Sequence, residues 1–235
     1  MANVSFDAVE FQDYRILRAY SKELDVEVLA INVESIPEVP ETFRNRIPED
    51  RYRKMLRYHY YLDKMLLIGN EILFEYGMRQ NFPEMESRQW IRQVDEAGKP
   101  YLEGTDLIYF NMSHAGIYSA CAFSKKPVGL DIEQIKPIAL SIAKRYYCRS
   151  EYEDIMEHSD EGRSRRFYQY WVLKESFIKA VGLGLSIPLN QFSFHDKAHS
   201  GLLHVEHNVN EGRYLSQEFS FCDSQYEMAL CIKDS

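Results

Sequence analysis

The sequence has few cysteines, no long apolar run and no excess of positive charge. Its four cysteines include no C-x-x-C pair and no histidine at zinc-finger spacing, which argues against a disulfide scaffold or a zinc finger. No apolar run approaches the roughly 20 residues of a membrane span. The N-terminus lacks the basic and apolar segments of a signal peptide. We therefore expect a cytoplasmic protein with reduced thiols and no membrane contact.

The charge balance is acidic, because 28 Lys and Arg residues against 36 Asp and Glu residues give a formal net charge of -8. A general nucleic-acid binder needs a basic surface to displace counterions from phosphates, so we expect no nucleic-acid partner. A local basic pocket can still hold a small phosphate ligand. Aromatic residues are abundant, with 17 Tyr and 13 Phe, so a large core can form without metal or disulfides.

Hydrophobic periodicity divides the chain into helices and strands, with no low-complexity segment and no obvious linker. A β-branched run predicts a strand at 25–33. Pro48 followed by two acids predicts the start of a long helix that continues through Leu73. Further predicted elements are a turn at 98–100, strands at 107–110, 117–123 and 128–132, helices at 138–147 and 165–181, and short strands around Phe192, Val205, Phe219 and Met228.

Two aromatic-rich helical segments faintly repeat one another. Tyr58–Lys64 (YHYYLDK) aligns with Tyr168–Lys174 (YQYWVLK), and each segment precedes a β-rich stretch. The repeat predicts two similar α+β halves packed together, and chance similarity between two amphipathic helices is the alternative.

The segment Gly129–Glu133 (GLDIE) carries two carboxylates on a predicted strand. Side chains alternate along a strand, so Asp131 and Glu133 share one face while Leu130 and Ile132 point to the core. Two neighbouring carboxylates repel each other unless a cation lies between them, and Mg²⁺ prefers such oxygen ligands. A solvated strand face is the alternative.

The segment Trp171–Lys179 (WVLKESFIK) places Glu175 and Lys179 one turn apart on the same face of a helix. An ordinary surface ion pair, worth only about 0.2–0.5 kcal/mol, is the alternative. The apolar neighbours Trp171, Phe177 and Ile178 favour a half-buried helix, which argues against a simple surface pair.

The segment Asn111–Gly116 (NMSHAG) lies between two apolar segments. On a strand, Ser113 and His114 would face opposite sides, which argues against the nucleophile and base of a serine hydrolase. In a turn, the hydroxyl, the imidazole and backbone N–H groups can converge on a phosphate, and a structural turn is the alternative.

A basic group opens the predicted long helix, and one further lysine follows Gly98. A solvated helix face is the usual interpretation of such a run, but in an acidic protein a local basic cluster favours an anionic ligand. The residues are Arg51, Arg53, Lys54, Arg57 and Lys99.

Together these patterns resemble the 4′-phosphopantetheinyl transferases, most of all their long, pseudo-dimeric Sfp-type members. The shared motifs are G-K-P at 98–100, F-N-x-S-H at 110–114, G-x-D-x-E at 129–133 and W-x-x-K-E-S-x-x-K at 171–179. The resemblance covers residues 48–228, and residues 1–24 are expected to be an N-terminal extension. It implies two α+β halves, 1–125 and 126–235, related by pseudo-twofold symmetry in a monomer, with the active site at their interface.

The resemblance also implies Mg²⁺ as cofactor and coenzyme A as co-substrate. Asp131, Glu133 and Glu175 match the family's magnesium ligands. Lys174 and Lys179 match lysines that hold the pyrophosphate of coenzyme A, and Lys179 also counts as a catalytic residue.

The nucleotide end of coenzyme A is implied to lie against Lys99, Ser113, His114 and Arg53. Several positions depart from the family's pattern there, so Arg51, Arg57 or Lys64 are alternative ligands of the 3′-phosphate. The departures are Asp50 in place of a lysine, Met65 and Leu66 in place of an arginine and a threonine, and Leu183 in place of a basic residue.

The implied reaction transfers the 4′-phosphopantetheine group of coenzyme A to a serine of an apo acyl or peptidyl carrier protein and releases 3′,5′-ADP. Glu151 would take the serine proton, although some relatives give this role to the position of Glu175. The carriers implied are small, acidic and helical, and we expect them to dock on the apolar stretch 134–140. Two other classes stay open: another magnesium-dependent phosphoryl-group enzyme, and a carrier- or nucleotide-binding module without catalysis.

Overall fold

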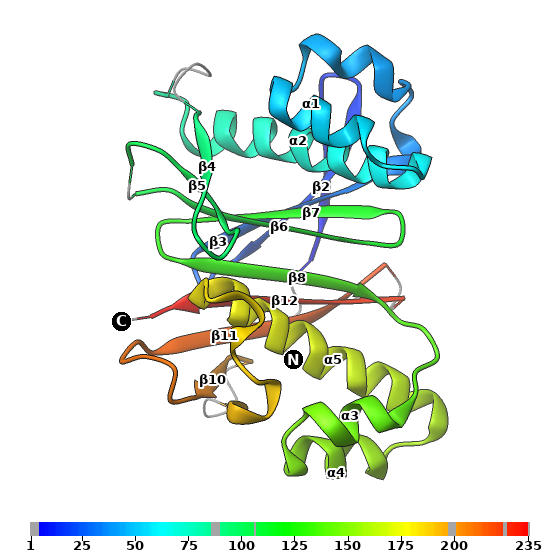
Figure 1. The fold of residues 1–235 in the computed structure, drawn as a ribbon, viewed down its shortest axis with the longest axis vertical. Helices are drawn as coiled ribbons and strands as arrows, with labels where there is room; N and C mark the ends of the chain where they lie inside the picture. Colours follow the sequence, from blue (N-terminus) through cyan, green and yellow to red (C-terminus); the bar gives the residue numbers. More distant parts are fainter. Residues whose placement is uncertain (1–4, 86–89, 106, 197–200, 223–224, 235) are drawn as a thin grey trace.

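The computed structural model of the protein describes residues 5–85, 90–105, 107–196, 201–222 and 225–234. Two five-stranded antiparallel sheets pack face to face at its centre, and a long helix covers the outer face of each (Figure 1). Apolar side chains of both inner faces form one core, which includes Val28 and Ala122 of the first sheet and Leu130 and Leu230 of the second.

The first sheet has the strand order β1-β2-β3-β7-β6. The helix α2 lies on its outer face, where Ile68 and Leu73 pack with Leu29, Ile31 and Phe123. The elements of this half are β1 (Asp7–Phe11), β2 (Tyr14–Ser21), β3 (Val26–Asn32), the 3-10 helices η1 (Val33–Ser35) and η2 (Pro40–Asn45), α1 (Glu49–Leu56), α2 (Tyr61–Asn81), the small hairpin β4 (Arg92–Val94) and β5 (Pro100–Leu102), β6 (Tyr109–Ala115) and β7 (Tyr118–Ser124).

The second sheet has the strand order β8-β12-β11-β10-β9, with α5 across its outer face and α3 and α4 beside α5 (Figure 1). Its elements are β8 (Val128–Gln134), α3 (Leu140–Tyr146), α4 (Arg149–Glu157), α5 (Asp160–Val181), η4 (Gly184–Ser186), η5 (Leu189–Gln191), β9 (Ser193–Asp196), β10 (Leu203–Glu206), β11 (Tyr214–Phe221) and β12 (Tyr226–Lys233).

Both halves follow the same order of elements, which confirms the prediction of two α+β halves. In the first half, β3 leads through α2 to the hairpin β6–β7, and the last strand, β7, pairs with β3. In the second half, β8 leads through α5 to the hairpin β11–β12, and β12 again pairs with the opening strand.

The strand β8 has the predicted alternation. Leu130 and Ile132 are buried between the sheets, whereas Asp131 pairs across the ladder with Ala229, which packs against α5. Gly129 allows α5 to lie directly on β8, because a Cβ atom at this position would lie 1.9 Å from the carbonyl oxygen of Ser176. The glycine of the G-x-D-x-E motif therefore brings α5 onto the strand that carries both carboxylates.

The first half differs from the predicted elements in three places. The predicted long helix is two helices, because the N–H groups of Arg57 and Tyr58 donate to Lys54 and Met55, three residues back, and so close α1. Ser113 and His114 lie on β6 and not in a turn. Within 1–24, β1 and β2 widen the first sheet, and Phe6 packs against Phe219 and Phe221 of the second half.

Cys121 and Cys231 are buried in strands, and all four cysteines are free thiols, as expected. Within the described ranges, no helix combines the length and the apolar character that a membrane span requires.

Candidate functional site

A pocket of about 240 Å³ lies between the two halves. Lys99 on the β4–β5 turn and Asn111 on β6 line it from the first half. Glu175 and Lys179 line it from α5, and Gly182 and Gly184 follow at the end of that helix. Three of the four sequence motifs singled out above therefore contribute residues to one pocket, and the fourth lies beside it through Asp131.

The centre of this site is the buried carboxylate of Asp131. Its Oδ1 atom accepts hydrogen bonds from the Oγ of Ser113 at 2.9 Å and from the Nζ of Lys179 at 2.6 Å. The same ammonium group donates to Ser113 Oγ at 3.0 Å and to the carbonyl oxygen of Leu130 at 3.1 Å. Asn111 joins the same two strands, because its side-chain oxygen accepts from the backbone N–H of Leu130 at 2.9 Å.

Burial and mutual repulsion disfavour the charged forms of the other two carboxylates. The pKa of Glu133 is raised to about 7 by burial and by the charge of Asp131, although Lys179 and a hydrogen bond from Trp171 act in the opposite direction. Burial and Asp131 also raise the pKa of Glu175 above its ordinary value. The three carboxylates together therefore bring more negative charge to the site than Lys179 alone neutralises.

The three carboxylates fit a hard divalent cation by their chemistry. Asp131 Oδ2 is buried and has no hydrogen-bond partner among the described residues, so one oxygen of this carboxylate is free for a ligand. In the described part of the chain, no three His, Cys, Asp or Glu side chains already surround one point as metal ligands do. Lys179 instead holds the other oxygen of Asp131.

Lys99 reaches into the pocket from the first half and contacts the second. Its Nζ donates to the carbonyl oxygen of Ala180, at the end of α5, at 3.1 Å and to that of Val128 at 3.3 Å. Burial lowers the pKa of Lys99 to about 8. The ammonium group has no carboxylate within ion-pair distance in the described residues, and Asp95 acts on it only from a greater distance, so an anion in the pocket would gain a cation that no contact ion pair neutralises.

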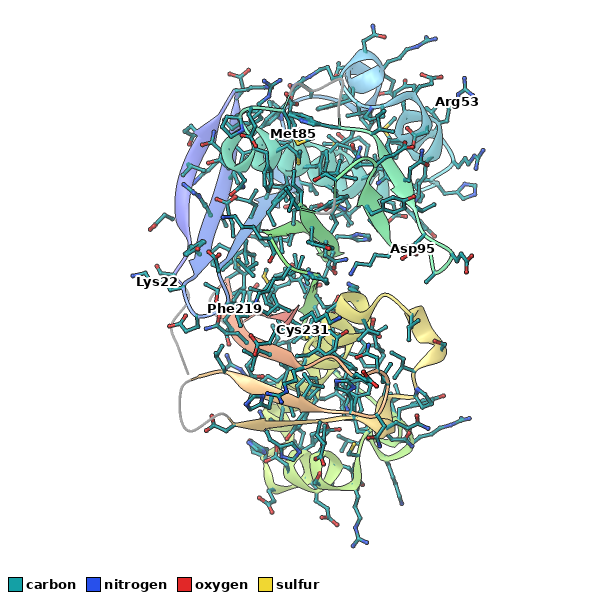
Figure 2. All side chains as sticks on the ribbon, turned by 90° about the vertical axis from the view of Figure 1, so that its left-hand side faces the viewer. Lys22, Arg53, Met85, Asp95, Phe219 and Cys231 are labelled. Carbon is teal, nitrogen blue, oxygen red and sulfur yellow. The ribbon has the colours of Figure 1, made fainter. Side chains whose placement is uncertain are left out.

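The residues expected at the nucleotide end are only partly brought together. His114 lies beside Ser113 on β6, and desolvation together with Lys179 lowers its pKa. Arg53 is an exposed residue of α1 that pairs with Glu49, and it does not line the pocket. Figure 2 shows Arg53 on the same side of the molecule as Asp95 in the β4–β5 turn, and Lys22 on the opposite side.

The alternative ligand Arg51 is already engaged elsewhere. Its Nε donates to the buried carboxylate of Glu71 at 2.9 Å, and Arg92 binds the same carboxylate. A phosphate would have to replace this pairing, so the structure does not favour Arg51 for that role.

Lys174 and Glu151 lie outside the pocket and contact each other. The ammonium group of Lys174 is 2.9 Å from Glu151 and donates to the carbonyl oxygens of Leu189 and Phe192 at 2.7 and 2.9 Å. Its side chain is 0% exposed, and Glu151 is also buried. The pair links α4, α5 and η5.

Sequence reasoning missed two aromatic side chains that lie near the carboxylates, Trp171 and Tyr147. The Trp171 indole binds Glu133, and Tyr147 lies close enough to Glu133, Glu151 and Glu175 for their charges to raise its pKa further above the level that burial gives it. From the sequence, Trp171 is an apolar neighbour and the first residue of the W-x-x-K-E-S-x-x-K motif, with no predicted role at the carboxylates. Its position one turn before Glu175 on α5 is the signal that could have identified it.

Comparison with known proteins gives concordant matches. Residues 127–231 match the family model of the 4′-phosphopantetheinyl transferase superfamily. The 4′-phosphopantetheinyl transferase Sfp of Bacillus subtilis (strain 168) is 31% identical over 192 residues, which cover 81% of this chain and 84% of that protein. The 4′-phosphopantetheinyl transferase psf-1 of Bacillus pumilus is 30% identical over 192 residues, 82% of this chain and 78% of its own.

Among solved structures, the holo-[acyl-carrier-protein] synthase of Thermotoga maritima matches 46% of this chain and 63% of its own length, with 21% identity and a TM-score of 0.38.

Proposed function

The chain belongs to the 4′-phosphopantetheinyl transferases, and we propose that it transfers the phosphopantetheine group of coenzyme A to a serine of an apo acyl or peptidyl carrier protein. The observation that carries this proposal is the pocket between the halves, which Lys99, Lys179 and Glu175 line and beside which Lys179 binds Asp131. The reaction needs cations that bind a pyrophosphate, and carboxylates that bind a metal ion and accept a proton.

Asp131, Glu133 and Glu175 would hold a magnesium ion, which when bound supplies charge neutralisation at the pyrophosphate. The unpartnered oxygen of Asp131 and the raised pKa values of the two glutamates support this assignment. Lys179 would turn from Asp131 toward the pyrophosphate oxygens. Ser113 would keep Asp131 oriented through the hydrogen bond that it already donates.

The transfer itself needs one nucleophile and one base. The carrier serine oxygen attacks the β-phosphorus of coenzyme A, the bond from that phosphorus to the oxygen of the leaving nucleotide breaks, and 3′,5′-ADP departs. We assign the base to Glu175, which lines the pocket, rather than to Glu151, whose buried carboxylate is engaged with Lys174. Lys99 and Lys179 would neutralise the charge that develops on the leaving group.

Lys99, Ser113 and His114 remain our candidates for the nucleotide, and Arg53 would reach the 3′-phosphate only from the rim of the site. For the carrier we propose the stretch 134–140 after β8, where Ile138 and Leu140 are half-buried against a cluster that includes Tyr147 and Phe167. Pro137 and Lys136 beside them are exposed.

We propose a monomer whose two halves divide between residues 125 and 126. The last strand of the first sheet ends at Ser124 and the first strand of the second begins at Val128, which supports this division. A cytoplasmic location is part of the same proposal, and the four free thiols fit a reducing compartment.

The test is incubation of the protein with a fluorescent coenzyme A derivative, Mg²⁺ and a panel of apo-carriers from fatty-acid, polyketide and peptide synthases. We expect a fluorescent carrier band and stoichiometric 3′,5′-ADP, both absent when the acceptor serine is replaced by alanine. Labelling of no carrier, or turnover of another nucleotide with coenzyme A inert, would overturn the proposal.

A further inference from the structure

A fourth carboxylate lies next to the proposed metal ligands on the sheet face beneath α5. Glu133 on β8 stands directly opposite Glu227 on β12, and Glu227 stands directly opposite Ser220 on β11. Directly opposed residues of antiparallel strands point to the same face with their Cβ atoms about 5 Å apart. Glu227 is therefore a neighbour of Glu133, yet it lies 94 residues further along the chain and outside every motif named above.

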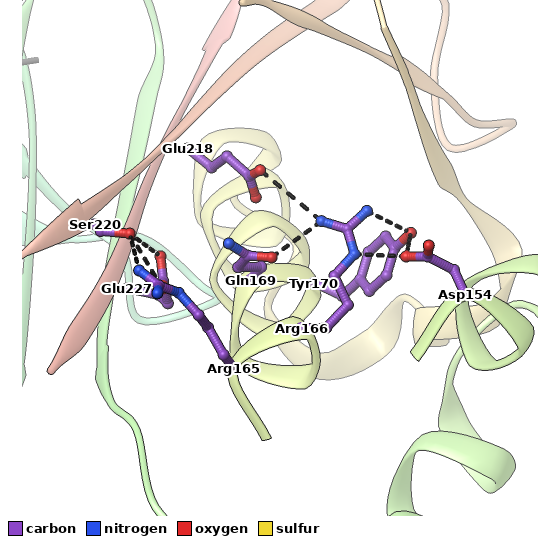
Figure 3. Close-up of polar contacts among 8 residues, drawn as sticks. All are labelled: Asp154, Arg165, Arg166, Gln169, Tyr170, Glu218, Ser220 and Glu227. Atoms are coloured by element: carbon purple, nitrogen blue, oxygen red, sulfur yellow. Dashed lines mark hydrogen bonds and ion pairs between the residues drawn. The ribbon is translucent and has the colours of Figure 1, made fainter. Parts of the chain in front are cut away.

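The carboxylate of Glu227 is held by Arg165 of α5 and by Ser220 of β11, the strand on the other side of β12 from β8. Arg165 of α5 donates from Nε to Oε1 at 2.8 Å, and the Ser220 hydroxyl contacts Oε1 and Oε2 at 3.2 and 3.1 Å (Figure 3). Arg165 also donates from Nη2 to Ser220 Oγ at 2.8 Å. The side chain of Glu227 is 1% exposed, so these groups and not water compensate its charge.

The pairing of cations with carboxylates on this face is uneven. Lys179 binds Asp131, Arg165 binds Glu227, and Glu133 instead accepts a hydrogen bond from the neutral indole of Trp171. Glu133, which stands opposite Glu227 on the neighbouring strand, is thus a carboxylate that a metal ion would have to neutralise.

We propose that Arg165 and Glu227 form a charge-neutral pair that sets the cation affinity of the site at Glu133, with Arg165 cancelling the charge of Glu227 and keeping its oxygens out of the ligand set. Both are positioning residues. The proposal rests on the assignment of Asp131, Glu133 and Glu175 as metal ligands. Because the two charges act on the cation with opposite sign, their separate removal has opposite effects, which loss of packing alone would not produce.

The experiment is a titration of the purified full-length protein with Mn²⁺ at pH 8, with free Mn²⁺ measured by electron paramagnetic resonance. We expect Arg165→Gln to lower the Mn²⁺ dissociation constant several-fold and Glu227→Gln to raise it by a similar factor. The double variant should return close to the wild-type value, and Arg165→Lys, which keeps the charge, should bind Mn²⁺ like the wild type.

Arg166→Gln is the matched control. Arg166 is the next residue on α5, and its partners include Asp154, Tyr170 and Glu218 (Figure 3). Glu218 lies on β11, two strands away from β8. Arg166 acts on Glu227 only through space and not through a hydrogen bond, so the control should lower the melting temperature as much as Arg165→Gln does and change Mn²⁺ binding clearly less.

Weaker Mn²⁺ binding in both single variants without recovery in the double variant would show that the pair is only structural and would overturn the inference. The same holds if Arg165→Lys behaves like Arg165→Gln. Absence of Mn²⁺ binding by the wild-type protein would instead overturn the proposed metal site, and the inference with it.

Discussion

Asp131, Glu133 and Glu175 differ in how the protein compensates their charge. Lys179 neutralises Asp131 directly, whereas Glu133 has an indole hydrogen bond and a pKa raised to about 7. Burial also raises the pKa of Glu175. Lys179 therefore compensates the negative charge of three acids. Removal of any one acid changes the electrostatic environment of the other two.

We expect Asp131→Ala, Glu133→Ala and Glu175→Ala each to lower the turnover number by at least about a hundredfold, since each takes one ligand from a shared ion. The double variants should be hardly worse than the singles. Fluorescent transfer assays measure the turnover, and circular dichroism checks the fold. Losses that multiply in the double variants would contradict a shared ion.

Lys99 gives a pH dependence that can be separated from the carboxylates. With a pKa of about 8, its ammonium group is about nine-tenths protonated at pH 7 and about one-tenth at pH 9. Because the proposed role requires the cation, the KM for coenzyme A should rise severalfold between these pH values.

Lys99→Met should raise the KM at pH 7 and remove most of its increase toward pH 9. Lys125→Met, on an exposed turn after β7, is the matched control and should keep the wild-type profile. An unchanged profile in Lys99→Met would mean that another group causes the pH dependence.

Local sequence patterns predicted those site residues whose placement depends on the periodicity of a strand or a helix. Alternation put Asp131 and Glu133 on one face, and a four-residue step put Glu175 and Lys179 on one face. The sequence could not show that Lys174 is buried, because α5 packs against the sheet on one side and against η5 and α4 on others. Burial on several sides follows from tertiary packing and leaves no simple period in the sequence.

At the level of elements, the Lys174–Glu151 pair fixes how α4, α5 and η5 sit beside the site. Loss of one partner from a buried ion pair leaves an uncompensated charge, so Lys174→Met and Glu151→Leu should each lower the free energy of unfolding by about 3–5 kcal/mol. The double variant removes both charges and should recover most of that stability and activity. Urea unfolding and the transfer assay measure the two effects.

The alternative roles of this pair make different predictions. A general base at Glu151 predicts that the double variant, although stable, has no transfer activity. A pyrophosphate contact of Lys174 predicts a higher KM for coenzyme A. Our assignment predicts neither outcome.

Element boundaries were harder to predict than the existence of the elements. The break between α1 and α2 falls at residues 57–60, where the sequence has neither Gly nor Pro, so the apolar spacing continued across it. The strands β1 and β2 matched no familiar motif, yet five residue pairs join β2 to β3 in the first sheet. Apolar residues are adjacent at 8–9, 16–17 and 19–20, so no strict alternation marks these strands in the sequence, although Tyr14, Ile16, Ala19 and Ser21 of β2 are buried.

At the scale of the whole molecule, the faint repeat of 58–64 and 168–174 indicated the architecture correctly. Tyr61 opens α2, and Tyr168–Lys174 lies within α5, so the similarity joins the two long helices that cover the sheets. Tyr58–Tyr60 precede α2, and Tyr60, Tyr61 and Leu62 are exposed, so packing of an apolar face against the sheet does not explain this part of the repeat. The sheet-to-sheet core and the pocket between the halves join residues distant along the chain, and a local pattern contains no information on them.

The encounter with a carrier also belongs to this scale. The enzyme has a net charge of -8, and the carriers expected for this family are acidic, so bulk electrostatics opposes association. Added salt screens that repulsion, because the Debye length falls from about 10 Å at 0.1 M to about 3 Å at 1 M. The KM for the carrier should therefore fall between low and moderate ionic strength, whereas attraction between opposite charges would make it rise.

Under these conditions, affinity has to come from a local apolar surface, and we expect Ile138→Glu to raise the KM for the carrier about tenfold or more while the KM for coenzyme A stays nearly constant. Ile138 is half-buried against the cluster that includes Tyr147, so thermal unfolding must show that the variant is folded. Leu107→Glu is the control, since Leu107 is 76% exposed on the first half and lies outside the proposed surface. A parallel rise in both KM values would indicate damage to the pocket. An unchanged carrier KM would show that the docking surface lies elsewhere, because a negative charge buried at an apolar interface with an acidic partner must weaken binding.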